Sequence, residues 1–152
     1  MQNDVFTEYV IKYSDMVYRI AYSYTRSIPD SEDIMQEVLL RLYQSGKEFR
    51  DEEHIKAWLI RVAVNRSKDV LRSHKRKNTA ELTADIPQPQ QENGLDEALC
   101  TLGEDYRLAV YLHYYEGYGV REIARIMRIS ESNVKIRLKR ARDKLKAFLT
   151  DE

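Results

Sequence analysis

The sequence predicts an all-α fold, made of two small helical domains joined by a flexible linker. Apolar residues recur at helical spacing along most of the 152-residue chain, and no segment of five or more residues alternates like a half-buried strand. Residues 78–93 contain two prolines, three glutamines and few large apolar side chains, which is typical of a linker. This segment separates an N-terminal domain, residues 1–77, from a C-terminal domain, residues 94–152.

The first helix is predicted from a single apolar stripe. Its members follow one another at spacings of four and three residues, which places them on one face over about six helical turns. They are Phe6, Val10, Tyr13, Val17, Ile20 and Tyr24. This face is expected to pack in the core of the N-terminal domain.

A second helix is predicted over about residues 32–45. Pro29 is expected in the connection before it. Asp30 or Ser31 can cap its N-terminus, and Gly46 ends it. Its expected core face is Ile34, Val38 or Leu39, and Leu42. The opposite face is polar and acidic, with Asp33, Gln36 and Glu37.

A third helix is predicted from about residue 54 to residue 76. Its buried side is expected to hold Trp58, Leu59, Val62, Ala63 and Val70. Polar residues recur on another face at spacings of four and three, as Arg61, Asn65, Lys68, Arg72 and Lys75. The cations suit phosphates, and an amide such as that of Asn65 can read the edge of a base. The alternative is a solvated helix face with an incidental asparagine.

Four helices are expected after the linker. They lie near residues 95–102, 104–116 and 120–127, and from a Ser130 cap to about residue 149. The last two predict a helix-turn-helix, because small or apolar residues stand where such helices pack together, at Ile123, Ala124, Met127, Ile129, Val134 and Leu138.

The final helix is basic on both sides of its apolar stripe. Arg and Lys side chains on such a helix can reach guanine edges and phosphates in the major groove of DNA. The alternatives are a solvated basic helix, or an arm that binds an acidic protein.

The charges of the chain are balanced in total but segregated along it. The 25 Lys and Arg residues match 25 Asp and Glu residues, and a neutral total would argue against a nucleic-acid binder. Residues 61–77, however, hold seven cations against one acid, and residues 121–146 hold ten against three. Residues 29–53 hold eight acids against three cations, and residues 78–93 hold three acids and no cation. This segregation indicates two basic faces for nucleic acid and an acidic face for a protein.

Several classes of function are disfavoured by patterns that the sequence lacks. The longest run without a formal charge, residues 108–115, is too short to insert across a membrane, and the first residues lack a secretory signal. A single cysteine, Cys100, forms no disulfide framework. No catalytic motif or metal-ligand pattern is found, so we expect a cytoplasmic, non-enzymatic protein without metal or cofactor.

Taken in order, these motifs resemble the extracytoplasmic-function (ECF) sigma factors of bacterial RNA polymerase, over nearly the whole chain. Residues 30–43 (DSEDIMQEVLLRLY) and 58–72 (WLIRVAVNRSKDVLR) resemble the second region of that family. Residues 115–127 (YEGYGVREIARIM) and 133–142 (NVKIRLKRAR) resemble its fourth region. Order, spacing and linker agree together, which is more specific than either motif alone.

The resemblance implies a promoter-recognition subunit that binds core RNA polymerase and promoter DNA and performs no chemistry of its own. It implies contacts with the polymerase clamp through the second helix, at Asp33, Gln36, Glu37 and Arg41. The acidic linker would thread the polymerase cleft. An anti-sigma factor is a further partner to expect.

The resemblance also implies two DNA sites. An unstacked base of the minus-ten element would be captured by Asn65 and by the loop that contains Phe49. Contacts with the DNA backbone there would come from Arg61, Lys68 and Arg72. The fourth region, beside the polymerase flap, would read the minus-thirty-five element with Lys135, Ile136, Arg137, Lys139 and Arg140.

Three positions depart from the family pattern. Residues 51–53, all acidic, stand where the loop usually has glycine and small polar residues, which bears on the shape of the base pocket. Ile136 replaces a serine or threonine, losing a hydrogen bond but offering contact with a thymine methyl group. Arg128 replaces the glycine of the helix-helix turn.

The residues alone are also compatible with two other functions. One is an ordinary helix-turn-helix repressor or activator, which would bind duplex DNA without polymerase. The other is a helical scaffold that binds only proteins. The Asn65 stripe and the acidic helix favour the sigma factor, since a simple regulator has no need of a second nucleic-acid domain.

Overall fold

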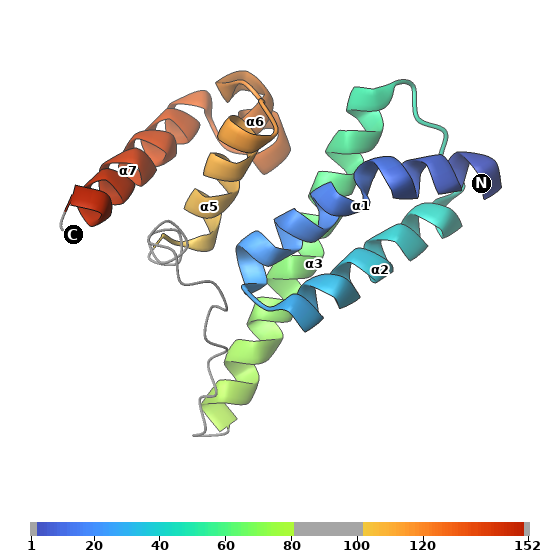
Figure 1. Cartoon of the computed structure of the whole chain (residues 1–152), viewed down its shortest axis with the longest axis horizontal. Helices are drawn as coiled ribbons and strands as arrows, with labels where there is room; N and C mark the ends of the chain where they lie inside the picture. The colour runs from blue at the N-terminus through green and yellow to red at the C-terminus, as the bar shows by residue number, and fades with distance from the viewer. Residues whose placement is uncertain (1–2, 81–101, 151–152) are drawn as a thin grey trace. The chain divides into compact units, whose positions relative to one another are not determined.

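The computed structural model describes residues 3–80 and 102–150, with side chains for residues 3–77 and 102–147 (Figure 1). Every regular element in these ranges is helical, which confirms the predicted all-α fold. The chain divides into two compact units, residues 1–86 and 87–152, and each is described here by itself. Most of the predicted linker, the helix predicted near residues 95–102, and Cys100 lie outside the described residues.

Over residues 3–80 the first unit contains three helices that pack against one another. They are α1 (Asn3–Thr25), α2 (Ile28–Ser45) and α3 (Glu52–Ala80) (Figure 1). The third helix is longer than predicted at both ends. Residues 78–80, which were expected to begin the linker, continue its backbone.

The core of the first unit follows the predicted apolar stripes with two corrections. In α1 the buried residues are Tyr13, Met16, Val17, Ile20, Ala21 and Tyr24, whereas Phe6 and Val10 are only half-buried. In α3 the buried side is rotated from the predicted one and holds Ile55, Leu59, Ile60, Ala63 and Ser67. Trp58, Val62 and Val70 lie at its margin. In α2 all four predicted core candidates, Ile34, Val38, Leu39 and Leu42, are buried.

The second helix begins earlier than predicted. Its N-cap is Ser27, whose Oγ accepts a hydrogen bond of 3.3 Å from the backbone N–H of Asp30. Pro29 therefore lies in the first helical turn, where the missing N–H of proline costs no hydrogen bond. Ser31 does not cap the helix. It is fully buried and donates to the carbonyl of Ser27 over 2.6 Å.

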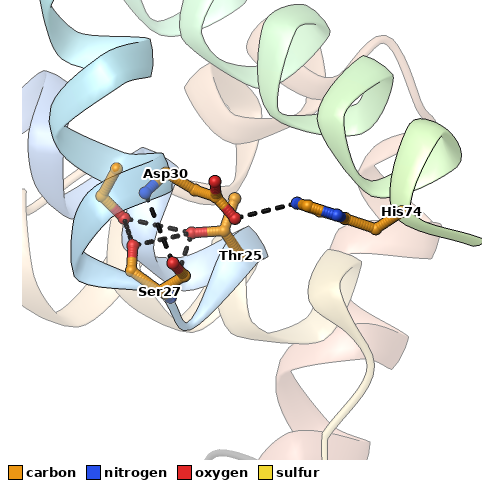
Figure 2. Close-up of polar contacts among 5 residues, drawn as sticks. Thr25, Ser27, Asp30 and His74 are labelled. Carbon is orange, nitrogen blue, oxygen red and sulfur yellow. Dashed lines mark hydrogen bonds and ion pairs between the residues drawn. The ribbon is translucent and has the colours of Figure 1, made fainter. Parts of the chain in front are cut away.

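A contact between side chains fastens the start of α2 to the distal part of α3. Figure 2 shows Asp30 reaching toward His74, with 2.9 Å between Oδ2 and Nε2. Thr25, at the end of α1, and Ser27, the N-cap of α2, complete the polar cluster beneath Asp30 (Figure 2). The basic end of α3 is thus held against the bundle.

The second unit is built around the last helix. Over residues 102–150 it comprises α5 (Glu104–Val110), the π-helical segment η1 (Tyr111–Tyr115), α6 (Val120–Met127) and α7 (Glu131–Thr150). The helix predicted over 104–116 is therefore α5 continued by η1. The side chains of α7 pack against both α5 and α6. Ser130 Oγ accepts a hydrogen bond from the N–H of Asn133 over 3.0 Å, which confirms the predicted cap.

Candidate nucleic-acid interface

The turn between α6 and α7 has helix-turn-helix geometry. Ile123, Ala124, Val134 and Leu138 are buried as predicted, and Ile126 and Ala141 of the same two helices are buried too. Met127 and Ile129 are only half-buried. Arg128 ends α6 in the left-handed region, with φ of 58° and ψ of 46°, and its N–H donates to the carbonyl of Ala124. This is the conformation that glycine adopts without strain, so an arginine here carries a steric cost.

The predicted polar stripe lies along one side of α3. Asn65, Lys68, Arg72 and Lys75 are exposed, and Arg61 is half-buried. Arg72 donates to Asp69 over 2.8 Å, one helical turn away, a surface pair of little net strength. The structure thus presents the Asn65 amide to solvent with cations before and after it on the helix.

The loop between α2 and α3 is anchored by an aromatic cluster. Phe49 makes edge-to-face contacts with Tyr9, His54 and Trp58, at centroid distances of 6.4, 5.2 and 5.8 Å. The sequence predicted Phe49 only as a DNA contact, whereas the structure shows it half-buried in packing. The ring therefore fixes the path of the loop beside Asn65's helix.

Two acidic residues where this loop meets α3 have structural partners. Asp51 Oδ1 accepts a hydrogen bond of 2.8 Å from the N–H of His54, so it caps α3. Glu52 forms an ion pair with Lys12 and accepts a hydrogen bond of 3.1 Å from the Tyr13 hydroxyl. These two contacts, with Lys12 the larger cause, hold the pKa of Glu52 below its usual value. Burial, and then the bond to Glu52, raises the pKa of Tyr13.

The outward face of α2 is mixed in character. Asp33 and Gln36 are exposed at the predicted positions, and Leu40 continues the same stripe with 54% of its surface exposed. Tyr43, about one turn further along α2, is also exposed. Neither Leu40 nor Tyr43 was predicted from the sequence as a member of this face. The sequence could have indicated that Leu40 is exposed, because Leu40 falls outside the apolar stripe that forms the buried face of α2. Leu40 and Tyr43 thus add exposed apolar surface beside the acids of this face.

Glu37 and Arg41 lie at the edge of that face. Glu37 is half-buried and pairs with Arg66 of α3, with 2.5 Å between Oε2 and Nε, and with Arg41 over 3.9 Å. Glu37 therefore links two helices within the unit, which the sequence did not indicate.

The basic residues of α7 differ in how far they are exposed to solvent. Lys135, Ile136 and Lys139 are exposed, whereas only 21% of the Arg137 side chain is exposed. Arg137 pairs with Asp105 of α5 over 3.9 Å. Arg140 is exposed, and its interaction with the Tyr106 hydroxyl lowers the pKa of that phenol. The five predicted contacts therefore do not form one uniform surface.

No helix in residues 3–80 or 102–150 combines the length and apolarity needed to cross a bilayer. Within the same ranges, no three His, Cys, Asp or Glu side chains are grouped as metal ligands.

Comparison with known families assigns both units. Residues 9–77 match the family model of sigma-70 region 2, and residues 92–145 match that of sigma-70, region 4. The sigma factor SigM of Bacillus subtilis, an ECF RNA polymerase sigma factor, is 34% identical over 147 residues, covering 90% of each chain. The chain belongs to the ECF sigma factors. It directs transcription initiation with RNA polymerase and is not an enzyme.

Further relatives of this sigma factor agree with that assignment. SigM of Mycobacterium tuberculosis is 30% identical over 139 residues, covering 88% of this chain and 71% of the relative. The sigma factor RpoE of Bartonella quintana, solved in complex with the anti-sigma factor NepR, has the same fold, with a TM-score of 0.77 at 21% identity. The two chains are covered over 95% and 96% of their lengths. CnrH, solved with the cytosolic domain of CnrY, gives a TM-score of 0.73 at 22% identity. The alignment covers 99% of this chain and 91% of CnrH.

Proposed function

We propose that this sigma factor divides promoter recognition between its two units. The N-terminal domain, residues 1–77, binds the polymerase clamp and the minus-ten element, and the C-terminal domain, residues 94–152, binds the minus-thirty-five element beside the flap. The observation that carries this division is the placement of the Asn65 stripe on α3 and of Lys135, Ile136 and Lys139 on α7. Apart from the half-buried Arg61, each set is exposed on its own helix, and neither contributes a buried residue to the core of its unit.

The clamp-binding surface is the outward stripe of α2, with Asp33, Gln36 and Leu40 at its centre. Its acids complement a basic partner, and the exposed leucine supplies apolar area that water otherwise surrounds. Glu37 and Arg41 flank it, with Glu37 partly engaged by Arg66.

The minus-ten site combines the exposed Asn65 amide with the loop fixed by Phe49. Unstacking a base costs a few kcal/mol, which hydrogen bonds from Asn65 and phosphate contacts from Arg61, Lys68 and Arg72 offset. Phe49 contributes by holding the loop in place through Tyr9, His54 and Trp58. The acidic residues Asp51 and Glu52 are occupied within the unit, so they belong to the scaffold of the pocket.

An anti-sigma factor is proposed as a further partner, acting in the cytoplasm where promoter DNA is found. The sigma factor RpoE was solved with the anti-sigma factor NepR, and CnrH was solved with the cytosolic domain of CnrY. The exposed Leu40 and Tyr43 of α2 offer it an apolar anchor, so its binding would compete with that of polymerase.

Run-off transcription with core polymerase and fragments of the source genome tests this proposal. The wild-type chain should support initiation at specific start sites, and Asp33→Arg should lower the affinity for core polymerase. The matched control is Asp15→Arg, which reverses an exposed acid on α1. Equal loss from both reversals would show that net charge, rather than the α2 surface, governs assembly. Absence of specific initiation above core polymerase alone would contradict the proposal as a whole.

A further inference from the structure

The distal end of α3 is basic and exposed. Among the described side chains of this helix, Ser67 is the last that is fully buried, and residues 72–77 are all exposed. These six residues include four lysines and arginines and no acid. The acid that precedes them, Asp69, is paired with Arg72 over 2.8 Å. Exposed cations gathered in this way attract a polyanion such as DNA.

The cations of this end lie on two sides of the helix. With about 3.6 residues per turn, Lys75 and Arg76 fall on the same side as Asn65, within an arc of about 100°. Lys77 falls on the other side, in line with the buried Leu59 five turns before it. Lys75 and Arg76 therefore extend the face that presents the Asn65 amide, whereas Lys77 does not.

A side-chain contact fixes the direction of this end. His74 continues the buried side of α3, two turns beyond Ser67, and its Nε2 lies 2.9 Å from Asp30 Oδ2 of α2 (Figure 2). Asp30 is itself held, because its backbone N–H donates to Ser27 Oγ over 3.3 Å and the adjacent Ser31 is fully buried. A helix end without buried side chains tends to fray. The contact with Asp30 therefore keeps the basic end of α3 helical and directed along the bundle.

Lys75 and Arg76 stand several base pairs away from the position of Asn65. The rise of about 1.5 Å per residue places them about 15–17 Å further along the helix axis. Stacked nucleotides advance about 3.4 Å per step on one strand, so this separation corresponds to about four or five nucleotides. The chain continues from this end toward the unit that is proposed to bind the upstream element. The DNA beside Lys75 and Arg76 is therefore the paired duplex upstream of the captured base.

We propose that Lys75 and Arg76 bind backbone phosphates of the duplex about four or five base pairs upstream of the base captured by Asn65. The contact between Asp30 and His74 positions them for this. Binding of this kind depends on charge and not on sequence, so it sets the register of the helix on the DNA without selecting bases. This inference rests on the proposed binding of the minus-ten element by the N-terminal unit.

The test uses holoenzyme assembled from the full chain and core polymerase. The probe is a promoter duplex that the wild-type holoenzyme selects from a random-sequence library. Copies of it carry uncharged methylphosphonates in place of two adjacent phosphates, at successive positions upstream of the minus-ten element. The wild type should lose affinity by about threefold or more when the neutral pair lies about four or five base pairs upstream of the captured base.

The lysine and arginine are tested together. The double variant with Lys75→Gln and Arg76→Gln should be insensitive to the neutral pair at that position, and its salt slope should fall by about two. The matched control is Lys77→Gln, which removes an exposed cation from the same turn on the other side of the helix. Its salt slope and its response to the neutral pair should equal those of the wild type.

Variants of Asp30 and His74 separate positioning from direct contact. Asp30→Ala and His74→Ala should each weaken promoter binding and reduce the loss caused by the neutral pair, and combining them should have no further effect. Asp30→Ala removes a negative charge, so an effect of charge alone would instead strengthen binding to DNA. Affinity for core polymerase without DNA should stay at the wild-type value, which a general loss of structure would lower.

Several outcomes would overturn the inference. They are a wild type indifferent to neutral phosphates at that position, a double variant that remains sensitive to them, an equal loss with Lys77→Gln, or tighter binding with Asp30→Ala. Thermal melting identifies a misfolded variant, and Asp30→Ala decides the positioning role should His74→Ala melt early. Normal promoter opening by Asn65→Ala would contradict the proposed minus-ten site, whereas the outcomes above would leave that site standing.

Discussion

Glu37 of α2 and Arg66 of α3 form an ion pair between helices, with 2.5 Å from Oε2 to Nε. The sequence marked Glu37 as a polymerase contact, and it left Arg66 outside the polar stripe of α3. The structure shows that Glu37 has an internal partner before any polymerase is bound. Because 34% of the Arg66 side chain and 38% of the Glu37 side chain are exposed, solvent screens the pair and limits its strength.

Glu37→Gln should therefore affect both stability and assembly. We expect the free energy of unfolding to fall by no more than about 1 kcal/mol, measured by urea denaturation. Asp33→Asn is the matched control, since it removes an exposed acid of the same helix and should leave stability unchanged. Both changes should weaken polymerase binding. If Glu37→Gln lowered the free energy of unfolding by the same amount in an Arg66→Ala background, the ion pair would have no part in its effect on stability.

The carboxylate of Glu52 should make the N-terminal unit sensitive to acid. Its pKa is lowered in the folded protein by hydrogen bonds from Lys12 and then Tyr13. A lowered pKa contributes stability above the unfolded value of 4.5, and this contribution is lost as the pH falls through the folded value. The stability difference between wild type and Glu52→Gln should thus shrink as the pH is lowered below 4.5. Urea midpoints at a series of pH values measure it, and a constant difference would contradict the assignment.

Arg128 should be a site where glycine stabilises the protein. Its φ of 58° is sterically costly for any residue with a Cβ, by about 1–2 kcal/mol. Glycine removes this steric strain but loses more conformational entropy on folding, which offsets part of the gain. Arg128→Gly should therefore raise the free energy of unfolding by about 0.5–1 kcal/mol. Arg125→Gly, at an exposed position inside α6, should lower it by about 1 kcal/mol. Thermal and urea unfolding compare the two, and loss of stability in both would show that the arginine side chain outweighs the strain.

Asn65 and Lys68 should differ in what they contribute at the minus-ten element. Asn65→Ala should slow promoter opening without changing polymerase affinity or thermal stability, because the amide is exposed. Lys68→Gln should weaken DNA binding on every sequence and reduce the salt slope by about one. Permanganate footprinting measures opening, and equilibrium binding at several salt concentrations measures the slope. A fall in melting temperature with Asn65→Ala would make that residue structural.

The sequence by itself determined the helices, the order of the motifs and the family. These follow from local patterns: apolar residues at spacings of three and four, glycines and serines at helix ends, and motif segments a few turns long. For the same reason the buried face of α2, part of the buried face of α1 and the cap at Ser130 were predicted. The start of α2 was misplaced because Ser27, Asp30 and Ser31 all have side chains suited to capping, and only the backbone decides among them.

The tertiary structure decided which charged and aromatic residues are occupied within the protein. Glu37 with Arg66, Phe49 with Tyr9, and Arg137 with Asp105 join residues far apart in the sequence. Their contacts depend on how each helix is rotated against its neighbours, and a side-chain stripe read along one helix carries no information about the face of another. Arg137 and Arg140 illustrate this, since they are three residues apart on α7 and differ in exposure because α5 covers one of them more than the other.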